Sequence, residues 1–171
     1  RTKLSENLFK GLSPWLSKLP GGLIHVNVVG CGLFAAISGS SAATVATVGK
    51  MSIPELRKRK YPEKILLGSL AGSGTLGLLI PPSIILIIYG VTIEDSIAKL
   101  FMAGIFPGIM LAIIFMLYVV VWSTINKKQM PKISEEFSFI EKIKRSKQLL
   151  PVVLLICSVI GSIYTGIATA T

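Results

Sequence analysis

Four long stretches without Asp, Glu, Lys or Arg constrain this chain more than any other feature. They are residues 19–49, 65–93, 100–126 and 148–171, and each exceeds the roughly 20 residues that a helix needs to cross a bilayer. Charged residues make up only 15% of the chain and cluster between these stretches, whereas a soluble domain averages about 25%. The sequence therefore predicts an all-α integral membrane protein. The net charge of +10 does not indicate a nucleic-acid partner, because the basic residues lie between apolar spans, as in membrane loops.

Two of the stretches are interrupted by residues that end helices. Residues 38–41 read Ser-Gly-Ser-Ser, and the segment 72–83 combines Gly-Ser-Gly-Thr-Leu-Gly with Pro81 and Pro82. Gly and Pro at this density break helices. In lipid, the freed backbone groups must find partners inside the protein or in a water-filled cavity. The breaks are therefore candidate binding sites, whereas 100–126 is typical of an uninterrupted transmembrane helix.

The charges between the stretches predict the orientation. Segment 50–64 holds six basic and two acidic residues, and segment 127–147 holds seven basic and three acidic residues. Segment 94–99 holds one basic and two acidic residues. By the positive-inside rule, the first two face the cytoplasm and the third faces outward. Residues 1–18, with four basic and one acidic residue, also favour the cytoplasm. Stretch 19–49 then begins and ends on one side, yet is shorter than the roughly 40 residues of two crossings, which predicts a re-entrant hairpin turning near 38–41.

The breaks are rich in oxygen ligands. They offer the hydroxyls of Ser38, Ser40, Ser41, Ser73 and Thr75, together with backbone carbonyls freed by unwinding. Hard cations such as Na⁺ take oxygen ligands of this kind in secondary transporters. The spans contain no carboxylate, so a proton relay is not expected.

Other interpretations of these residues stay open at this point. Ser, Thr and Gly also serve close helix packing, which is the favoured interpretation of the Gly68/Gly72 and Gly104/Gly108 pairs. Asn27 fits a structural hydrogen bond and a site role equally. An intramembrane serine protease using His25 with Ser38, Ser40 or Ser41 is a rival, but His25 lies 13 residues before Ser38, about 20 Å along a helix. A purely structural membrane scaffold would leave both breaks unexplained.

Four segments occur in the order and spacing of a known family. They read LPGGL at 19–23, FAAISGSSAAT at 34–44, GTLGLLIPPS at 74–83 and YTGIAT at 164–169. With them the chain resembles, over residues 16–171, the large membrane subunit of TRAP transporters (tripartite ATP-independent periplasmic transporters, the DctM-like permeases). Family chains are much longer and include earlier helices, so the expectation is a fragment that does not transport alone. Ala170 stands where many members have Pro.

The resemblance implies a sodium-coupled importer of organic anions (C4-dicarboxylates, other carboxylic acids or sialic acid) and not an enzyme. It implies a multi-pass protein of the bacterial or archaeal cytoplasmic (inner) membrane. It also implies two partners, a smaller membrane subunit and a periplasmic substrate-binding protein. The implied fold has two inverted repeats, each with a re-entrant hairpin and a broken helix, moving as an elevator. No cofactor is expected besides Na⁺ as the coupling ion. A sodium–anion carrier that works without a binding protein remains the nearest alternative.

The resemblance also assigns site residues. The implied sodium ligands share the breaks and are Ser38, Gly39, Ser40, Ser41, Gly74, Thr75 and Gly77, with Gly166 and Thr169 at the start of a second hairpin. The implied substrate residues are Ser40, Ser41, Thr44, Pro81 and Pro82.

The expected organisation is a series of membrane segments and loops. It comprises an amphipathic interfacial helix (1–18), the re-entrant hairpin (19–49), a cytoplasmic basic loop (50–64), a broken transmembrane helix (65–93), a periplasmic loop (94–99), a transmembrane helix (100–126), a cytoplasmic linker (127–147) and the start of the second repeat (148–171). The run 57–60 predicts a topology signal in contact with membrane lipid headgroups.

Overall fold

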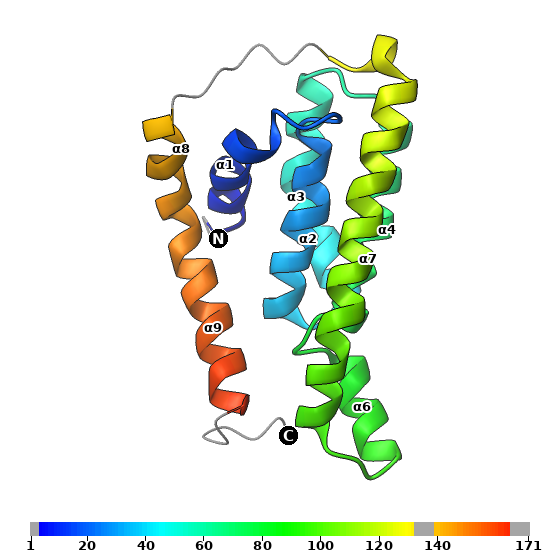
Figure 1. Cartoon of the computed structure of the whole chain (residues 1–171), viewed down its shortest axis with the longest axis vertical. Helices are drawn as coiled ribbons and strands as arrows, with labels where there is room; N and C mark the ends of the chain where they lie inside the picture. The colour runs from blue at the N-terminus through cyan, green and yellow to red at the C-terminus, as the bar shows by residue number, and fades with distance from the viewer. Residues whose placement is uncertain (1–3, 132–138, 165–171) are drawn as a thin grey trace.

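The computed structural model describes residues 4–131 and 139–164, and every regular element within these ranges is helical. Helices α2 (Ile24–Ser38), α3 (Ser41–Lys58), α4 (Glu63–Gly74) and α7 (Ile97–Ile125) form an elongated bundle (Figure 1). Two helical stretches, Glu63–Thr92 and Ile97–Ile125, are long and apolar enough to cross a membrane. The all-α part of the prediction is therefore confirmed.

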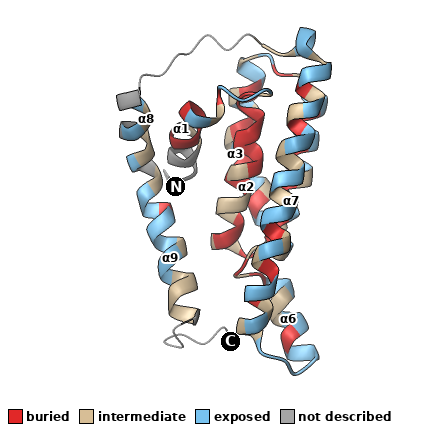
Figure 2. Ribbon diagram, in the orientation of Figure 1, coloured by how far each residue is buried: buried red, intermediate tan, exposed pale blue. Residues whose placement is uncertain are grey.

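Helices α2 and α3 form an antiparallel hairpin at the centre of the bundle. Only Gly39 and Ser40 separate them, and α2 is apolar on nearly every side, as expected of an interior helix. Figure 2 shows buried residues along both helices, and α2 alone carries nine of them. The second limb continues beyond Gly49 and through Pro54 to Lys58, so part of the basic segment 50–64 is helical.

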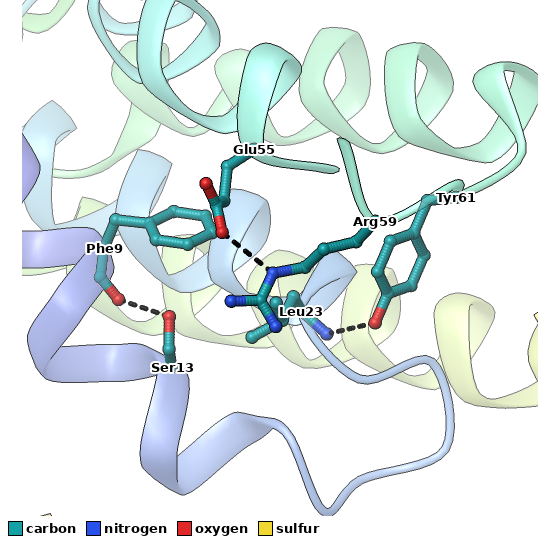
Figure 3. A network of polar contacts seen from close by, with 6 residues as sticks. All are labelled: Phe9, Ser13, Leu23, Glu55, Arg59 and Tyr61. Carbon is teal, nitrogen blue, oxygen red and sulfur yellow. Dashed lines mark hydrogen bonds and ion pairs between the residues drawn. The ribbon is translucent and has the colours of Figure 1, made fainter. Parts of the chain in front are cut away.

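The open end of the hairpin is fixed by polar contacts, shown in Figure 3, and by an apolar cluster. The backbone N–H of Leu23 donates to the Tyr61 hydroxyl at 3.1 Å, and Arg59 Nε donates to Glu55 Oε1 at 2.8 Å. The surrounding cluster of buried side chains comes from α1 (Leu4–Leu16), the hairpin, α4 and α7 and includes Leu12, Leu56 and Ile65. These contacts hold the base of the hairpin while its tip lies at the other end of α2.

Beyond the hairpin, the broken helix predicted from Gly and Pro is present. It consists of α4, the short α5 (Leu76–Leu79) and α6 (Ile84–Thr92), with interruptions at Thr75 and over residues 80–83. Helix α7 then returns along α4 without interruption, although it contains Pro107. A short helix η1 (Lys127–Gln129) follows it.

The last described elements form a separate column beside the hairpin in Figure 1. They are α8 (Phe139–Ser146), η2 (Lys147–Leu149) and α9 (Leu150–Tyr164). Helix α1 packs against α8 and η2. The Trp15 indole N–H donates to the Ser146 hydroxyl at 2.8 Å, and the Lys142 ammonium lies 5.6 Å from the centre of the same ring.

Candidate functional site: the hairpin tip and the helix break

The hairpin tip is built by a left-handed glycine followed by a capping serine. Gly39 has φ +62° and donates its N–H to the Ala35 carbonyl at 2.9 Å, ending α2. A glycine at this position is the usual end of a helix because it adopts this backbone without steric cost. Ser40 is extended, and its hydroxyl accepts the Ala43 N–H at 3.5 Å, starting α3. The sequence Ser-Gly-Ser-Ser therefore turns the chain within two residues.

Three oxygens of the tip lie close together. The Thr44 hydroxyl donates to the Ser40 carbonyl at 2.7 Å, and the hydroxyls of Ser38 and Thr44 are 2.8 Å apart. The Ser38 hydroxyl is also 3.2 Å from the Ser40 carbonyl. Thr44 is fully buried, whereas Ser38 and Ser40 are half-buried. The cluster presents lone pairs from the end of one helix and the start of the next.

The break in the second span is stabilised by side chains that donate hydrogen bonds to backbone carbonyls of the same segment. The Thr75 hydroxyl donates to the Gly72 carbonyl at 2.7 Å, and the Ser83 hydroxyl donates to the Leu78 carbonyl at 2.8 Å. Between them, Pro81 and Pro82 have no backbone N–H. Thr75 is exposed and Pro82 is half-buried, so part of the break is accessible to solvent.

The structure brings the tip and the break into direct contact. The Ile84 N–H, at the start of α6, donates to the Gly39 carbonyl at 3.2 Å. A Cβ atom on Gly77 would lie 2.8 Å from the Ser41 nitrogen, and one on Gly39 would lie 2.8 Å from the Pro82 carbonyl oxygen. Helix α5 and the 80–83 segment therefore pack backbone to backbone against residues 39–41.

Within the described residues, the predicted site residues gather at one place. The hairpin contributes Ser38, Gly39, Ser40, Ser41 and Thr44, and the break approaches them at Gly74, Gly77 and Pro82. Thr75 and Pro81 belong to the same break, and the Thr75 hydroxyl bonds within it. Gly166 and Thr169 lie outside the described residues.

Some candidate polar residues have structural hydrogen bonds away from the tip. The Ser73 hydroxyl donates to the Ser69 carbonyl at 2.6 Å and is fully buried. The Asn27 amide donates to the Ser69 hydroxyl at 3.0 Å and lies near the Leu66 carbonyl at 3.3 Å. Asn27 thus fastens α2 to α4, three turns from the tip.

Two contributions were not predicted from the sequence, namely the Ile84 N–H and the buried Ser83 hydroxyl. Ser83 directly follows the proline pair, and a hydroxyl at that place was the available signal. Ile84 offered none, because any non-proline residue has an N–H.

The serine-protease alternative is not supported by the geometry. His25 Nε2 lies 2.8 Å from the Pro20 carbonyl, at the opposite end of α2 from Ser38. A nucleophile needs a base within hydrogen-bond reach. The hydroxyls of Ser38 and Ser40 instead bond within the tip.

The donor atoms at the site are those that a hard cation prefers, and not those that a transition metal prefers. No group of three or more His, Cys, Asp or Glu side chains gathers in the described part of the chain. The available donors are hydroxyl and carbonyl oxygens. Such donors suit alkali ions, while softer metals favour imidazole and thiolate.

Comparison with known proteins identifies the chain. The family described as "Tripartite ATP-independent periplasmic transporter, DctM component" matches residues 1–171. The chain belongs to this family. The family is one of transporter components and not of enzymes, and the predicted resemblance is confirmed.

Its relatives among TRAP permeases differ in the substrate that they are named for. The C4-dicarboxylate TRAP transporter large permease protein DctM of Pseudomonas aeruginosa is 40% identical over 88% of this chain and 35% of its own length. The ectoine/5-hydroxyectoine large permease protein UehC of Ruegeria pomeroyi is 32% identical over all of this chain and 39% of its own. The sialic acid permease protein SiaT of Haemophilus influenzae is 35% identical over 98% of this chain and 27% of its own. The chain thus spans about a third of the length of these relatives.

Proposed function

We propose that the chain is part of the large permease of a sodium-coupled TRAP transporter that imports an organic anion. The observation that carries the proposal is the contact between the hairpin tip and the helix break. Paired breaks of this kind supply the ion and substrate sites of secondary transporters. In this proposal, the hairpin re-enters the membrane and the complete permease moves as an elevator in the inner membrane.

The first sodium site uses the oxygens around Ser38, Ser40 and Thr75. The Ser38 hydroxyl and the Ser40 carbonyl converge at the tip, and Thr75 is exposed at the facing break. Gly39, Gly74 and Gly77 permit the close approach, and the carbonyls of the break add ligands. Ser41 contributes its hydroxyl from the first turn of α3. A second sodium site includes Gly166 and Thr169.

The start of α3 is suited to a carboxylate. Helix N-termini attract anions through free N–H groups and the helix dipole. The Ser40 hydroxyl accepts the N–H of Ala43, and the Ser40 carbonyl accepts the N–H of Thr44. The helix start can therefore receive the carboxylate at Ala42, which is exposed. The substrate therefore lies beside Ser40 and Ser41, with Pro81 and Pro82 as a wall. Thr44 is buried, and it holds the Ser40 carbonyl in place.

A C4-dicarboxylate is the substrate to test first, because the relative at 40% identity is named for it. Ectoine and sialic acid are the next candidates for the same reason. In this proposal, a periplasmic binding protein delivers the substrate and a smaller membrane subunit packs beside the large one.

The test uses the complete permease reconstituted with its small subunit and binding protein. Uptake of labelled succinate is measured with and without a sodium gradient, for wild type, Thr75→Ala and Ser40→Ala. We expect uptake to require sodium and both variants to raise the sodium concentration for half-maximal uptake. Thr124→Ala is the matched control for Thr75→Ala, because the Thr124 hydroxyl bonds the carbonyl three residues back in the same way, at 2.8 Å.

Other outcomes separate the alternatives. Sodium-independent uptake, or unchanged sodium dependence in Thr75→Ala and Ser40→Ala, would show that the tip serves only helix packing and binds no coupling ion. Uptake that persists without the binding protein would favour a sodium–anion carrier that works without one. Failure with succinate directs the same assay to ectoine and sialic acid.

A further inference from the structure

An apolar groove lies on the outside of the bundle, away from the tip and the break. It has a volume of about 280 Å³ and lies between α4 and α7 over part of α2. Its walls are Gly68, Ile114, Phe115 and Tyr118, and its floor includes the buried Val28.

The groove exists because α4 and α7 meet at one turn and leave space at the next. A Cβ atom on Gly72 would lie 3.3 Å from the Phe115 ring, whereas one on Gly68 would meet nothing within 4 Å. Gly68 is one turn nearer to the start of α4. The sequence suggested close packing for both glycines, but in the described residues only Gly72 is packed.

The groove offers no free hydrogen-bonding group from Ser69, its one serine. The Ser69 hydroxyl donates to the Leu66 carbonyl at 3.0 Å and accepts the Asn27 amide at 3.0 Å. Ile114 and Tyr118 are about half exposed along the rim. An apolar chain fits such a surface, and a polar solute does not.

Exposed lysines lie at the end of the bundle where α4 begins and α7 ends. Lys64 lies on α4, about 6 Å along the helix from Gly68, and Lys127 and Lys128 follow the end of α7. All three are exposed. Among the described residues, the carboxylates of this end are already paired, Glu63 with Arg57 and Glu55 with Arg59. Within residues 4–131 and 139–164, the three lysines are therefore available to an anion.

We propose that the groove and these three lysines together bind one anionic phospholipid. An acyl chain fills the groove beside Gly68, and the phosphate lies against Lys64, Lys127 and Lys128. The charge complementarity selects this occupant, because an apolar helix of a partner would leave the lysines without a counter-charge. A lysine near a membrane surface strengthens anionic-lipid binding by about fivefold. This site is separate from the proposed transport site and does not depend on the substrate.

The experiment measures lipid retention by native mass spectrometry. The complete permease, with its small subunit, is purified from nanodiscs that contain equal amounts of phosphatidylglycerol and phosphatidylcholine. We expect wild type to retain phosphatidylglycerol selectively. Gly68→Leu fills the groove, and the triple change Lys64→Gln, Lys127→Gln and Lys128→Gln removes the cations. The triple change should lower phosphatidylglycerol retention by about tenfold or more, and Gly68→Leu should also lower it.

Two controls match these variants. Gly161→Leu makes the same substitution on α9, where a Cβ would also meet nothing within 4 Å, so it reports the effect of Gly→Leu outside the groove. The triple change Lys18→Gln, Lys58→Gln and Lys60→Gln removes equal charge from exposed positions outside the proposed headgroup site. Both controls should retain the lipid, and thermal unfolding checks that every variant is folded.

Three results would overturn the proposal. Equal retention of phosphatidylcholine would show that the lysines do not select a headgroup. Equal loss in both lysine triples would indicate diffuse attraction to the basic end. If the large subunit purified alone retains the lipid and the complex with the small subunit does not, the small subunit covers the groove.

Discussion

Individual glycines determine how closely the hairpin tip and the helix break approach each other. At Gly77 an added Cβ would lie 2.8–3.0 Å from three backbone atoms of Ser40 and Ser41. Backbone cannot move aside as the end of a flexible side chain can. The position therefore controls the geometry of the proposed sodium site without supplying a hydroxyl to it.

Gly77→Ala should separate the tip from the break. We expect a loss of about 1–3 kcal/mol in stability, as for other overpacked sites, and a higher sodium requirement for uptake. Thermal unfolding and sodium-dependent uptake of the complete permease measure the two effects. Gly68→Ala is the control, because its Cβ meets nothing within 4 Å. A Gly77→Ala protein with wild-type stability and sodium response would contradict the contact described here.

At this scale, the sequence identified which residues carry oxygen but not where each hydroxyl points. Ser73 and Thr75 are two residues apart, yet Ser73 is buried against α4's own backbone while Thr75 is exposed. Ser and Thr often bond to nearby carbonyls, and only tertiary packing determines which of them stay accessible. The Ile84–Gly39 hydrogen bond could not be predicted either, because it joins two backbone groups that are distant in sequence.

Among the elements, the base of the hairpin depends on one phenol. Tyr61 is buried in the α3–α4 connection and accepts the backbone N–H of Leu23, which is also buried. Tyr61→Phe leaves that N–H without an acceptor, at a cost of about 1–3 kcal/mol. The expected lower melting temperature is measured on the complete permease. Tyr118→Phe, at a half-exposed position, should melt like wild type, and an unchanged melting temperature for Tyr61→Phe would count against this role.

The same phenol predicts a pH dependence at high pH. Burial raises the pKa of Tyr61 above its ordinary value near 10, against smaller opposing effects of the Leu23 hydrogen bond and Arg59. The folded protein therefore prefers the neutral phenol. Its stabilising contribution is complete below about pH 10 and is lost as the pH rises through the raised pKa. The stability difference between wild type and Tyr61→Phe should shrink across that range, and a constant difference would contradict it.

The helix breaks were predictable from sequence because Gly and Pro act locally. The turn at 38–41 and the interruption before Ile84 accordingly lie where their residues are. The course of α3 through Pro54 to Lys58 was not predicted, nor was the packing of α1 against α8. Both depend on partners distant in sequence. Here packing overrides the local preference of a proline and places an amphipathic segment against another helix.

At the scale of the whole molecule, helix length limits how far the hairpin can reach. Helix α2 has 15 residues, about 22 Å at 1.5 Å per residue, while the hydrocarbon core is about 30 Å thick. Lys18, which precedes the hairpin, and Lys58, the last residue of its second limb, are both exposed. A hairpin anchored at one surface by these lysines would therefore place residues 39–41 inside the membrane. Secondary transporters hold their coupling ions near the bilayer midplane, so this depth is the one that the proposed sodium site requires.

The unequal charge of the two ends predicts the orientation, which cysteine labelling can test. The permease is first made cysteine-free, including Cys157, which is exposed. Single cysteines are then placed at Lys18, Lys58, Lys128 and Ser96, all exposed. Because basic segments stay in the cytoplasm, a membrane-impermeant maleimide added to spheroplasts should label Ser96→Cys alone. The other three should react only after the membrane is opened. Labelling of Lys18→Cys and Lys58→Cys from opposite sides would show that the α2–α3 segment crosses the membrane rather than re-entering it, and the ion site proposed at its tip would then lack its depth.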